Sequence, residues 1–167
     1  KESRWRRDDP PNRNVVYIEI QRTVPASELT KFRKFLSGNE QKAELTELSQ
    51  DTIKYATAIL DKDISHYRVA SLSDSDTRMY VGRSGEKNYS QFHFGAGEAS
   101  IIATVDRIET SGDNSLILIE EIENGLHPVA VRLMINYLEN VARRKRHQII
   151  FTTHSQDAID QLPAEAI

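Results

Sequence analysis

The first third of the chain alternates between strand-like and helix-like patterns of apolar side chains. The run Val15–Ile20 is rich in β-branched residues and predicts a strand. Ser27 can cap a short helix, which Gly38 would end. Apolar positions from Leu45 to Ile59 then keep helical spacing, so a longer amphipathic helix is expected over about 40–61.

Between residues 66 and 94 the period of the apolar positions shortens toward two. This spacing predicts strands at 67–72, 78–81 and 90–94, with polar turns at 73–76 and 82–88. Short strands joined by short turns favour antiparallel pairing. We therefore expect a small antiparallel meander in the middle of the chain.

After Gly97 the pattern changes to alternating helices and buried strands. The predicted helices are 99–110, 128–145 and one capped by Ser155, and the predicted strands are 115–119 and 148–152. The inner face of helix 128–145 would carry Ala130, Leu133, Met134, Tyr137, Leu138 and Val141. Strands separated by helices imply a parallel sheet. The predicted class is α/β, a parallel sheet with flanking helices plus the antiparallel meander.

Composition narrows the class of protein. At 167 residues the chain can bury a sizeable core, and its net charge of -3 gives no general attraction to nucleic acid or membrane. The absence of cysteine excludes disulfides and thiolate metal sites. No signal sequence is visible in these residues, and no apolar run approaches the ~20 residues of a membrane helix. We expect a cytoplasmic protein with no membrane partner.

The ends of the chain suggest how it is divided. Residues 1–14 are polar and predict a flexible lead-in. Residues 15–89 would form the strand, helical and meander part of one domain, and residues 90–167 its α/β part. The chain begins without Met and stops shortly after Pro163, so we expect a piece of a longer polypeptide, truncated at both ends.

Two adjacent carboxylates follow the most apolar predicted strand. Leu116–Ile119 runs directly into Glu120 and Glu121, at the edge of a parallel sheet where ligands bind. One carboxylate at a strand end can hold Mg²⁺ through its waters, and the next can orient or deprotonate a water. An exposed acidic loop is the alternative, because Glu123 lies close by.

Two further motifs carry candidate chemistry. Phe94–Glu98 places glycines before a helix, where the backbone can approach a phosphate and present helix amides to it. A tight turn is the alternative. His154 follows the second buried strand and can donate to a phosphate oxygen, although a lone histidine there is often only a satisfied polar residue.

The order of these motifs resembles the C-terminal lobe of ABC-type ATPases. Within these it is most similar to the group of OLD-family nucleases, SMC-like ATPases and AAA ATPases of toxin and phage-defence systems. The resemblance spans about residues 90–160, while residues 15–89 offer a compatible layout. It implies a partial P-loop NTPase fold of ABC-ATPase type.

The resemblance assigns roles to individual positions. Gly95, Ala96, Gly97 and Glu98 would be the signature motif that contacts the ATP of a partner subunit. Glu120 would take the Mg²⁺ role of Walker B, and Glu121 would be the general base. Asn124 and Gly125 would belong to the D-loop at the dimer interface. His154 would be the switch histidine that senses the γ-phosphate.

Two departures and one gap qualify this resemblance. Gly95 stands where the signature usually has Ser, and Glu120 where the first Walker B acid is often Asp. No GxxxxGK[ST] phosphate loop occurs in the chain. We expect that loop upstream in the parent polypeptide, and we expect this piece alone to be inactive and to bind ATP poorly or not at all.

The function implied is an ATP-driven dimer clamp. Two copies would sandwich ATP and Mg²⁺ as a homodimer and hydrolyse the ATP. The work driven would be nucleic-acid processing or phage defence, with DNA or RNA bound through an attached domain. One alternative is a non-catalytic dimerisation or regulatory module that kept the fold. A less favoured alternative is a metal-dependent nuclease using Glu120, Glu121 and Glu123.

Overall fold

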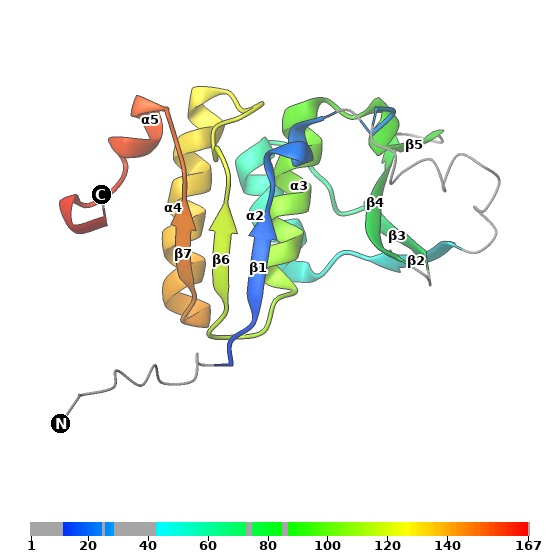
Figure 1. The fold of residues 1–167 in the computed structure, drawn as a ribbon. Coiled ribbons are helices and arrows are strands. Elements are labelled where there is room, and N and C mark those ends of the chain that lie inside the picture. The colour runs from blue at the N-terminus through cyan, green and yellow to red at the C-terminus, as the bar shows by residue number, and fades with distance from the viewer. Residues whose placement is uncertain (1–11, 25, 29–42, 73–74, 85–86, 167) are drawn as a thin grey trace.

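Three parallel strands form the sheet that carries the candidate site (Figure 1). The computed structural model describes residues 12–24, 26–28, 43–72, 75–84 and 87–166. The strand order is β1 (Val15–Ile18), β6 (Leu116–Ile119) and β7 (Gln148–Phe151). All three point the same way, so the prediction of helix-separated parallel strands is confirmed.

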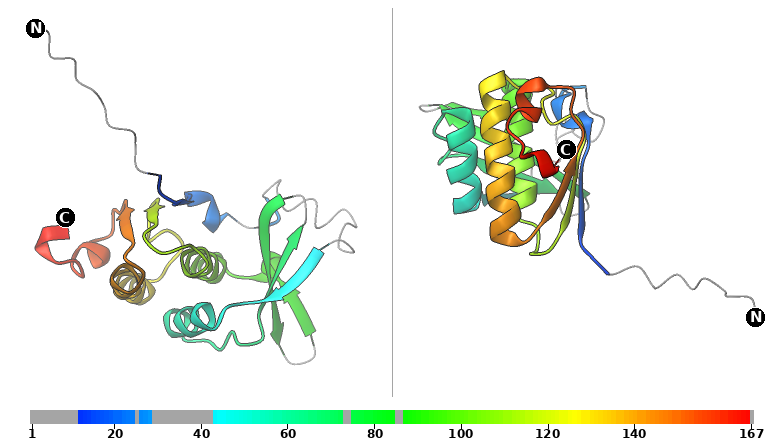
Figure 2. Two further views of the ribbon diagram at one scale, coloured as in Figure 1. Left: turned by 90° about the horizontal axis from the view of Figure 1, so that it is seen from below. Right: turned by 90° about the vertical axis from the view of Figure 1, so that its left-hand side faces the viewer.

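The long helices all lie on one side of this sheet, with the first of them in an outer layer behind the other two (Figure 2). They are α2 (Gln50–Leu60), α3 (Ala96–Glu109) and α4 (Pro128–Lys145), and a short α5 (Gln156–Ile159) follows β7. The predicted inner face of α4 was partly wrong: Val131 and Ile135 are buried, whereas Leu133 is 37% exposed. The apolar stripe of α4 is wider than the surface that contacts the sheet, so Leu133 falls at its margin.

A second, antiparallel sheet lies beside α2 and α3 (Figure 1). Its order is β2 (Ala43–Glu47), β3 (Arg68–Leu72), β4 (Ser75–Ser84) and β5 (Lys87–Ser90). The meander is thus confirmed, with different boundaries. The predicted helix over 40–61 starts only at Gln50, because residues 43–47 pair with β3. The predicted strand at 90–94 is replaced by the 3-10 turn η4 (Gln91–His93).

Gly82 explains why the turn predicted at 82–88 is narrower in the structure, where Ser84 already pairs with Lys87. It lies within β4 opposite Tyr89, and an ideal Cβ there would come within 2.8 Å of the Tyr67 ring and 2.9 Å of the Tyr89 ring. The glycine lets two aromatic rings approach the strand and does not mark a turn. The predicted helix from Ser27 to Gly38 lies outside the described residues except for the turn 26–28.

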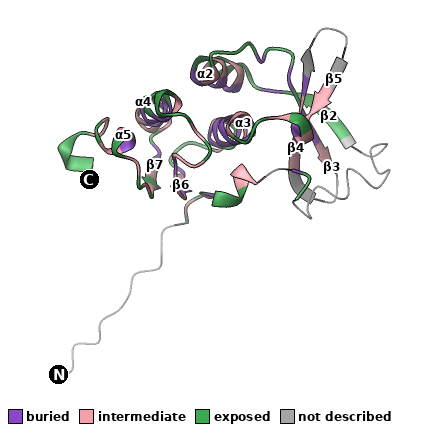
Figure 3. Cartoon of the chain, turned by 90° about the horizontal axis from the view of Figure 1, so that it is seen from above, coloured by how far each residue is buried: buried purple, intermediate pink, exposed green. Residues whose placement is uncertain are grey.

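One core joins the two sheets through the helices (Figure 3). Its most buried side chains include Ile64, Ile102, Val105, Ile117, Met134 and Val141. His147 is also buried, and burial lowers its pKa. Its Nδ1 accepts a hydrogen bond from the Ser115 amide at 3.1 Å.

None of the helices in the described part of the chain has the length and apolarity to cross a bilayer.

Candidate functional site

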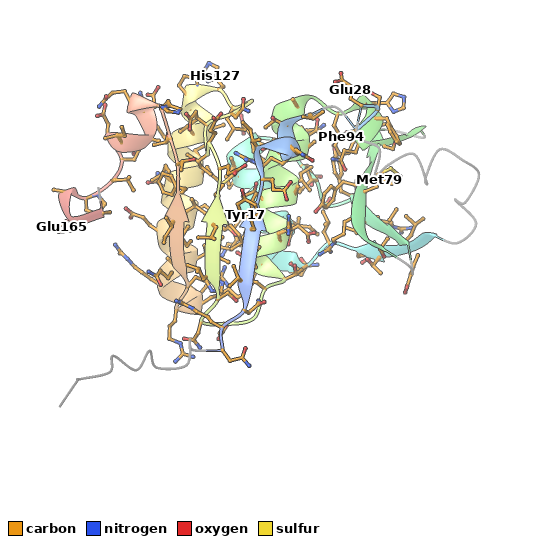
Figure 4. The ribbon with its side chains drawn as sticks, viewed as in Figure 1. Tyr17, Glu28, Met79, Phe94, His127 and Glu165 are labelled. Atoms are coloured by element: carbon orange, nitrogen blue, oxygen red, sulfur yellow. The ribbon has the colours of Figure 1, made fainter. Side chains whose placement is uncertain are left out.

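Glu120 follows β6 at the carboxyl end of the parallel sheet. Its carboxylate accepts a hydrogen bond from the Tyr17 hydroxyl and another from the Ile20 amide, 3.0 Å from Oε2. Tyr17 comes from β1, the neighbouring strand, and lies on the sheet face turned away from the helices (Figure 4). Both donors favour the charged carboxylate, so the Tyr17 hydroxyl and then the Ile20 amide lower the pKa of Glu120.

Glu121 has a left-handed backbone, with φ of +41°. Its amide donates to Thr152 Oγ1 at 2.9 Å, and its carbonyl accepts from Arg22 Nη2 at 2.6 Å and from the Asn124 amide at 2.9 Å. A positive φ is uncommon for a residue with a side chain and persists only when its surroundings hold it. The side chains along β6 point alternately to the two faces of the sheet, and this alternation ends at Glu121. The position of the Glu121 side chain therefore depends on these contacts.

Glu123 links the acidic turn, which comprises residues 120–125, to the end of β7. Its carboxylate accepts the Thr153 hydroxyl and the His154 amide, each at 2.7 Å. Burial raises the pKa of Glu123, but these two hydrogen bonds outweigh it and the pKa lies below its ordinary value. The His154 residue itself is exposed. The structure thus brings the predicted acids and the predicted histidine to the same rim of the sheet.

The glycine turn, which comprises residues 94–98, lies at the same rim and contacts the acidic turn. Gly95 is the N-cap of α3, and Gly97 lies in its first turn. An ideal Cβ on Gly97 would lie only 2.6 Å from the carbonyl oxygen of Gly125, so the two backbones touch. Gly125 has φ of +76°, and the neighbouring Asn124 donates through Nδ2 to Thr23 Oγ1 at 3.3 Å. The predicted signature and D-loop segments therefore lie in contact within one chain.

Unlike the other predicted site residues, Glu98 has a carboxylate that is bound by residues away from the rim. Its side chain is 17% exposed, and it accepts hydrogen bonds from Lys62 Nζ at 2.8 Å and from the Tyr67 hydroxyl at 2.7 Å. Both partners belong to the α2–β3 region, so the carboxylate anchors α3 to the antiparallel part of the fold. Gly95 and Ala96 are exposed, which leaves the first turn of α3 open to a ligand.

Arg22, Tyr17 and Thr152 contact the acidic turn but were not predicted. Arg22 is half-buried in the 3-10 turn η1 (Ile20–Thr23), which follows β1. A usable signal was present, since the carboxyl ends of parallel strands share one edge of a sheet. Polar residues after the first strand could therefore have been included in the site.

This rim places a carboxylate and the amides at the start of a helix close together, which are groups that can bind a cation and an anion. Glu120 offers a charged carboxylate, and α3 begins beside the acidic turn, where Gly97 contacts Gly125. Among the described residues, no group of three or more His, Asp or Glu side chains could hold a metal by itself. A cation bound here would need further ligands from a phosphate or water, as Mg²⁺ commonly does.

A protein family described as "AAA domain, putative AbiEii toxin, Type IV TA system" matches residues 2–160. The match covers nearly the whole chain and includes both sheets and all of the site residues above. No curated protein matches the chain. The parallel sheet with flanking helices and a separate antiparallel sheet is consistent with a P-loop NTPase-like AAA domain.

Proposed function

The chain belongs to this AAA-domain family, and on that premise we propose that it supplies the catalytic acids and phosphate-sensing residues of a Mg²⁺-dependent ATPase. The observation that carries the proposal is the meeting of three motifs at one rim. The acidic turn contacts the β7 end through Glu121 and Glu123, and it contacts the glycine turn through Gly125.

The two adjacent acids have separate roles in this proposal. Glu120 holds Mg²⁺, through water, because its low pKa keeps it charged and Tyr17 fixes its orientation. When bound, Mg²⁺ neutralises charge on the phosphates. Glu121 accepts a proton from the attacking water, and its left-handed backbone directs it away from the position of Glu120.

The remaining residues bind phosphate. His154 donates a hydrogen bond to the γ-phosphate, and the Glu123 carboxylate holds the main chain that carries it. The backbone of Gly95, Ala96 and Gly97 at the start of α3 contacts the ATP of a second copy. Glu98 positions the helix through Lys62 and Tyr67 and does not touch phosphate.

The whole assembly is a homodimer that sandwiches ATP, with Asn124 and Gly125 near the partner copy. The phosphate loop comes from another part of the parent polypeptide, since no GxxxxGK[ST] occurs in these residues. The resemblance to OLD-family and SMC-like ATPases supports a task in nucleic-acid processing or phage defence, and the family description names a putative toxin of a type IV TA system. These roles belong to the complete protein.

Glu121→Gln in the full-length protein tests this function. The change keeps the size of the side chain and removes the base, so we expect kcat for ATP hydrolysis to fall about 10²- to 10⁴-fold while ATP still binds. Glu139→Gln is the matched control, because Glu139 lies on α4 and pairs only loosely with Arg143 at 3.9 Å. Equal rates for Glu121→Gln and Glu139→Gln would remove Glu121 from the mechanism.

A non-catalytic dimerisation module remains the second candidate. Gly95 favours it, since no hydroxyl is present at that position to bind a partner's phosphate, and the chain has no phosphate loop. ATP-dependent dimerisation without hydrolysis in the full-length protein would select it. The nuclease alternative is weaker, because the Glu120 and Glu123 carboxylates are engaged by different parts of the fold.

A further inference from the structure

The guanidinium of Arg22 lies against the main chain of the acidic turn. Nη1 donates to the carbonyl of Glu120 at 2.6 Å, and Nη2 donates to the carbonyl of Glu121 at 2.6 Å. Nε donates to Ser100 Oγ on α3 at 3.1 Å, and Nη1 also reaches the carbonyl of Glu19 at 3.1 Å. The Arg22 side chain therefore connects the end of β1, the acidic turn and helix α3.

The surroundings of Arg22 suit a permanent cation. Burial lowers its pKa from the ordinary value, and the charges of Glu120, Glu121 and Glu123 oppose that effect. The planar fork of a guanidinium can serve several acceptors at fixed angles, which a lysine ammonium cannot do. Arg22 consequently stays charged and spans acceptors from three segments.

The contacts of Arg22 bear directly on the unusual backbone of Glu121. That residue is held at φ of +41° by Thr152 Oγ1 on its amide and by Arg22 on its carbonyl. Without the second contact, the backbone can relax toward a more common conformation. A change at Glu121 would also move Asn124, whose amide donates to the same carbonyl.

We infer that Arg22 is a positioning residue, which holds Glu121 in its left-handed conformation and sets the distance between the acidic turn and the start of α3. Its effect on hydrolysis rests on the proposed function; its effect on the backbone does not. Arg22 acts through the main chain of the acidic turn and through Ser100 Oγ, and we assign it no contact with substrate or metal.

The test compares Arg22→Gln and Arg22→Lys with Arg68→Gln in the full-length protein. Arg68 is a matched arginine on the antiparallel sheet, 55% exposed and 3.8 Å from Glu47. Hydrogen exchange of the peptide covering 120–124 should speed up about tenfold in Arg22→Gln, less in Arg22→Lys, and not in Arg68→Gln. Exchange as slow in Arg22→Gln as in Arg68→Gln would overturn the inference, whether or not the protein hydrolyses ATP.

Kinetics provide the second readout. We expect Arg22→Gln to lower kcat about 10²-fold with little change in the KM for ATP, because a small misplacement of a catalytic group costs rate. In a Glu121→Gln background, the same change should lower kcat less than about threefold, since residues that act as a unit are not additive. Equal losses in both backgrounds would show a general structural defect and refute the positioning role.

Discussion

Replacing Gly97 by alanine tests the contact between the glycine turn and the acidic turn. The added methyl would lie 2.6 Å from the Gly125 carbonyl oxygen, whereas real Cβ contacts shorter than 3.0 Å essentially never occur. The two segments must therefore separate, and the opposing atom is backbone, which cannot rotate away as a side chain could. The second nearby group, Leu126, lies at 3.7 Å and offers no obstacle.

Two opposing effects decide the magnitude for Gly97→Ala. Overpacking a close contact costs about 1–3 kcal/mol. Alanine also favours a helix over glycine by up to about 1 kcal/mol, and less in the first turn, where Gly97 lies. The expected result is a net loss of about 0.5–2 kcal/mol in the free energy of unfolding. For a chain of this size, that lowers the Tm by roughly 1–8 °C.

Gly112→Ala is the matched control, because an ideal Cβ at Gly112 meets nothing within 4 Å and its φ is not positive. That variant should be unchanged or more stable by about 0.4–1 kcal/mol, through a less flexible unfolded chain. Urea denaturation of both variants measures the difference. If Gly97→Ala gained stability alongside Gly112→Ala, the close approach of the two backbones would be refuted.

Two pH-dependent predictions follow from other buried or hydrogen-bonded groups. The pKa of Glu123 is lowered, so its contribution to stability is present above the ordinary pKa of 4.5 and is lost as the pH falls below that value. Glu123→Gln should therefore cost about 1 kcal/mol at pH 7, after allowance for its partial exposure, and the difference should shrink toward pH 4 in urea titrations. A constant difference would contradict hydrogen bonds that depend on the charged carboxylate. The pKa of His147 is also lowered, so below about pH 6.5 the unfolded state binds a proton that the folded state does not, and stability falls by at most about 1.4 kcal/mol per pH unit. His147→Gln should flatten this slope between pH 7.5 and 5.5, and an unchanged slope would assign it to another group.

Local patterns in the sequence were sufficient to predict much of the fold of this protein. The apolar strands before Glu120 and Thr152, and the periodic helix between them, predicted a parallel sheet because burial and period depend on near neighbours along the chain. Pro128 marked the first residue of α4 as expected. The same local reasoning failed at Leu45, which fits both a helix and a strand, because pairing with β3 decided the outcome.

The tertiary structure alone decided how the site residues are held. Sequence placed Glu121 after a strand, but its left-handed backbone depends on Thr152 and Arg22, which are 31 and 99 positions away. Glu98 matched a motif, yet its carboxylate is taken by Lys62 and Tyr67. Hydrogen bonds between distant segments leave no periodic trace in a single sequence, because they arise only when folding brings the strand ends to one rim.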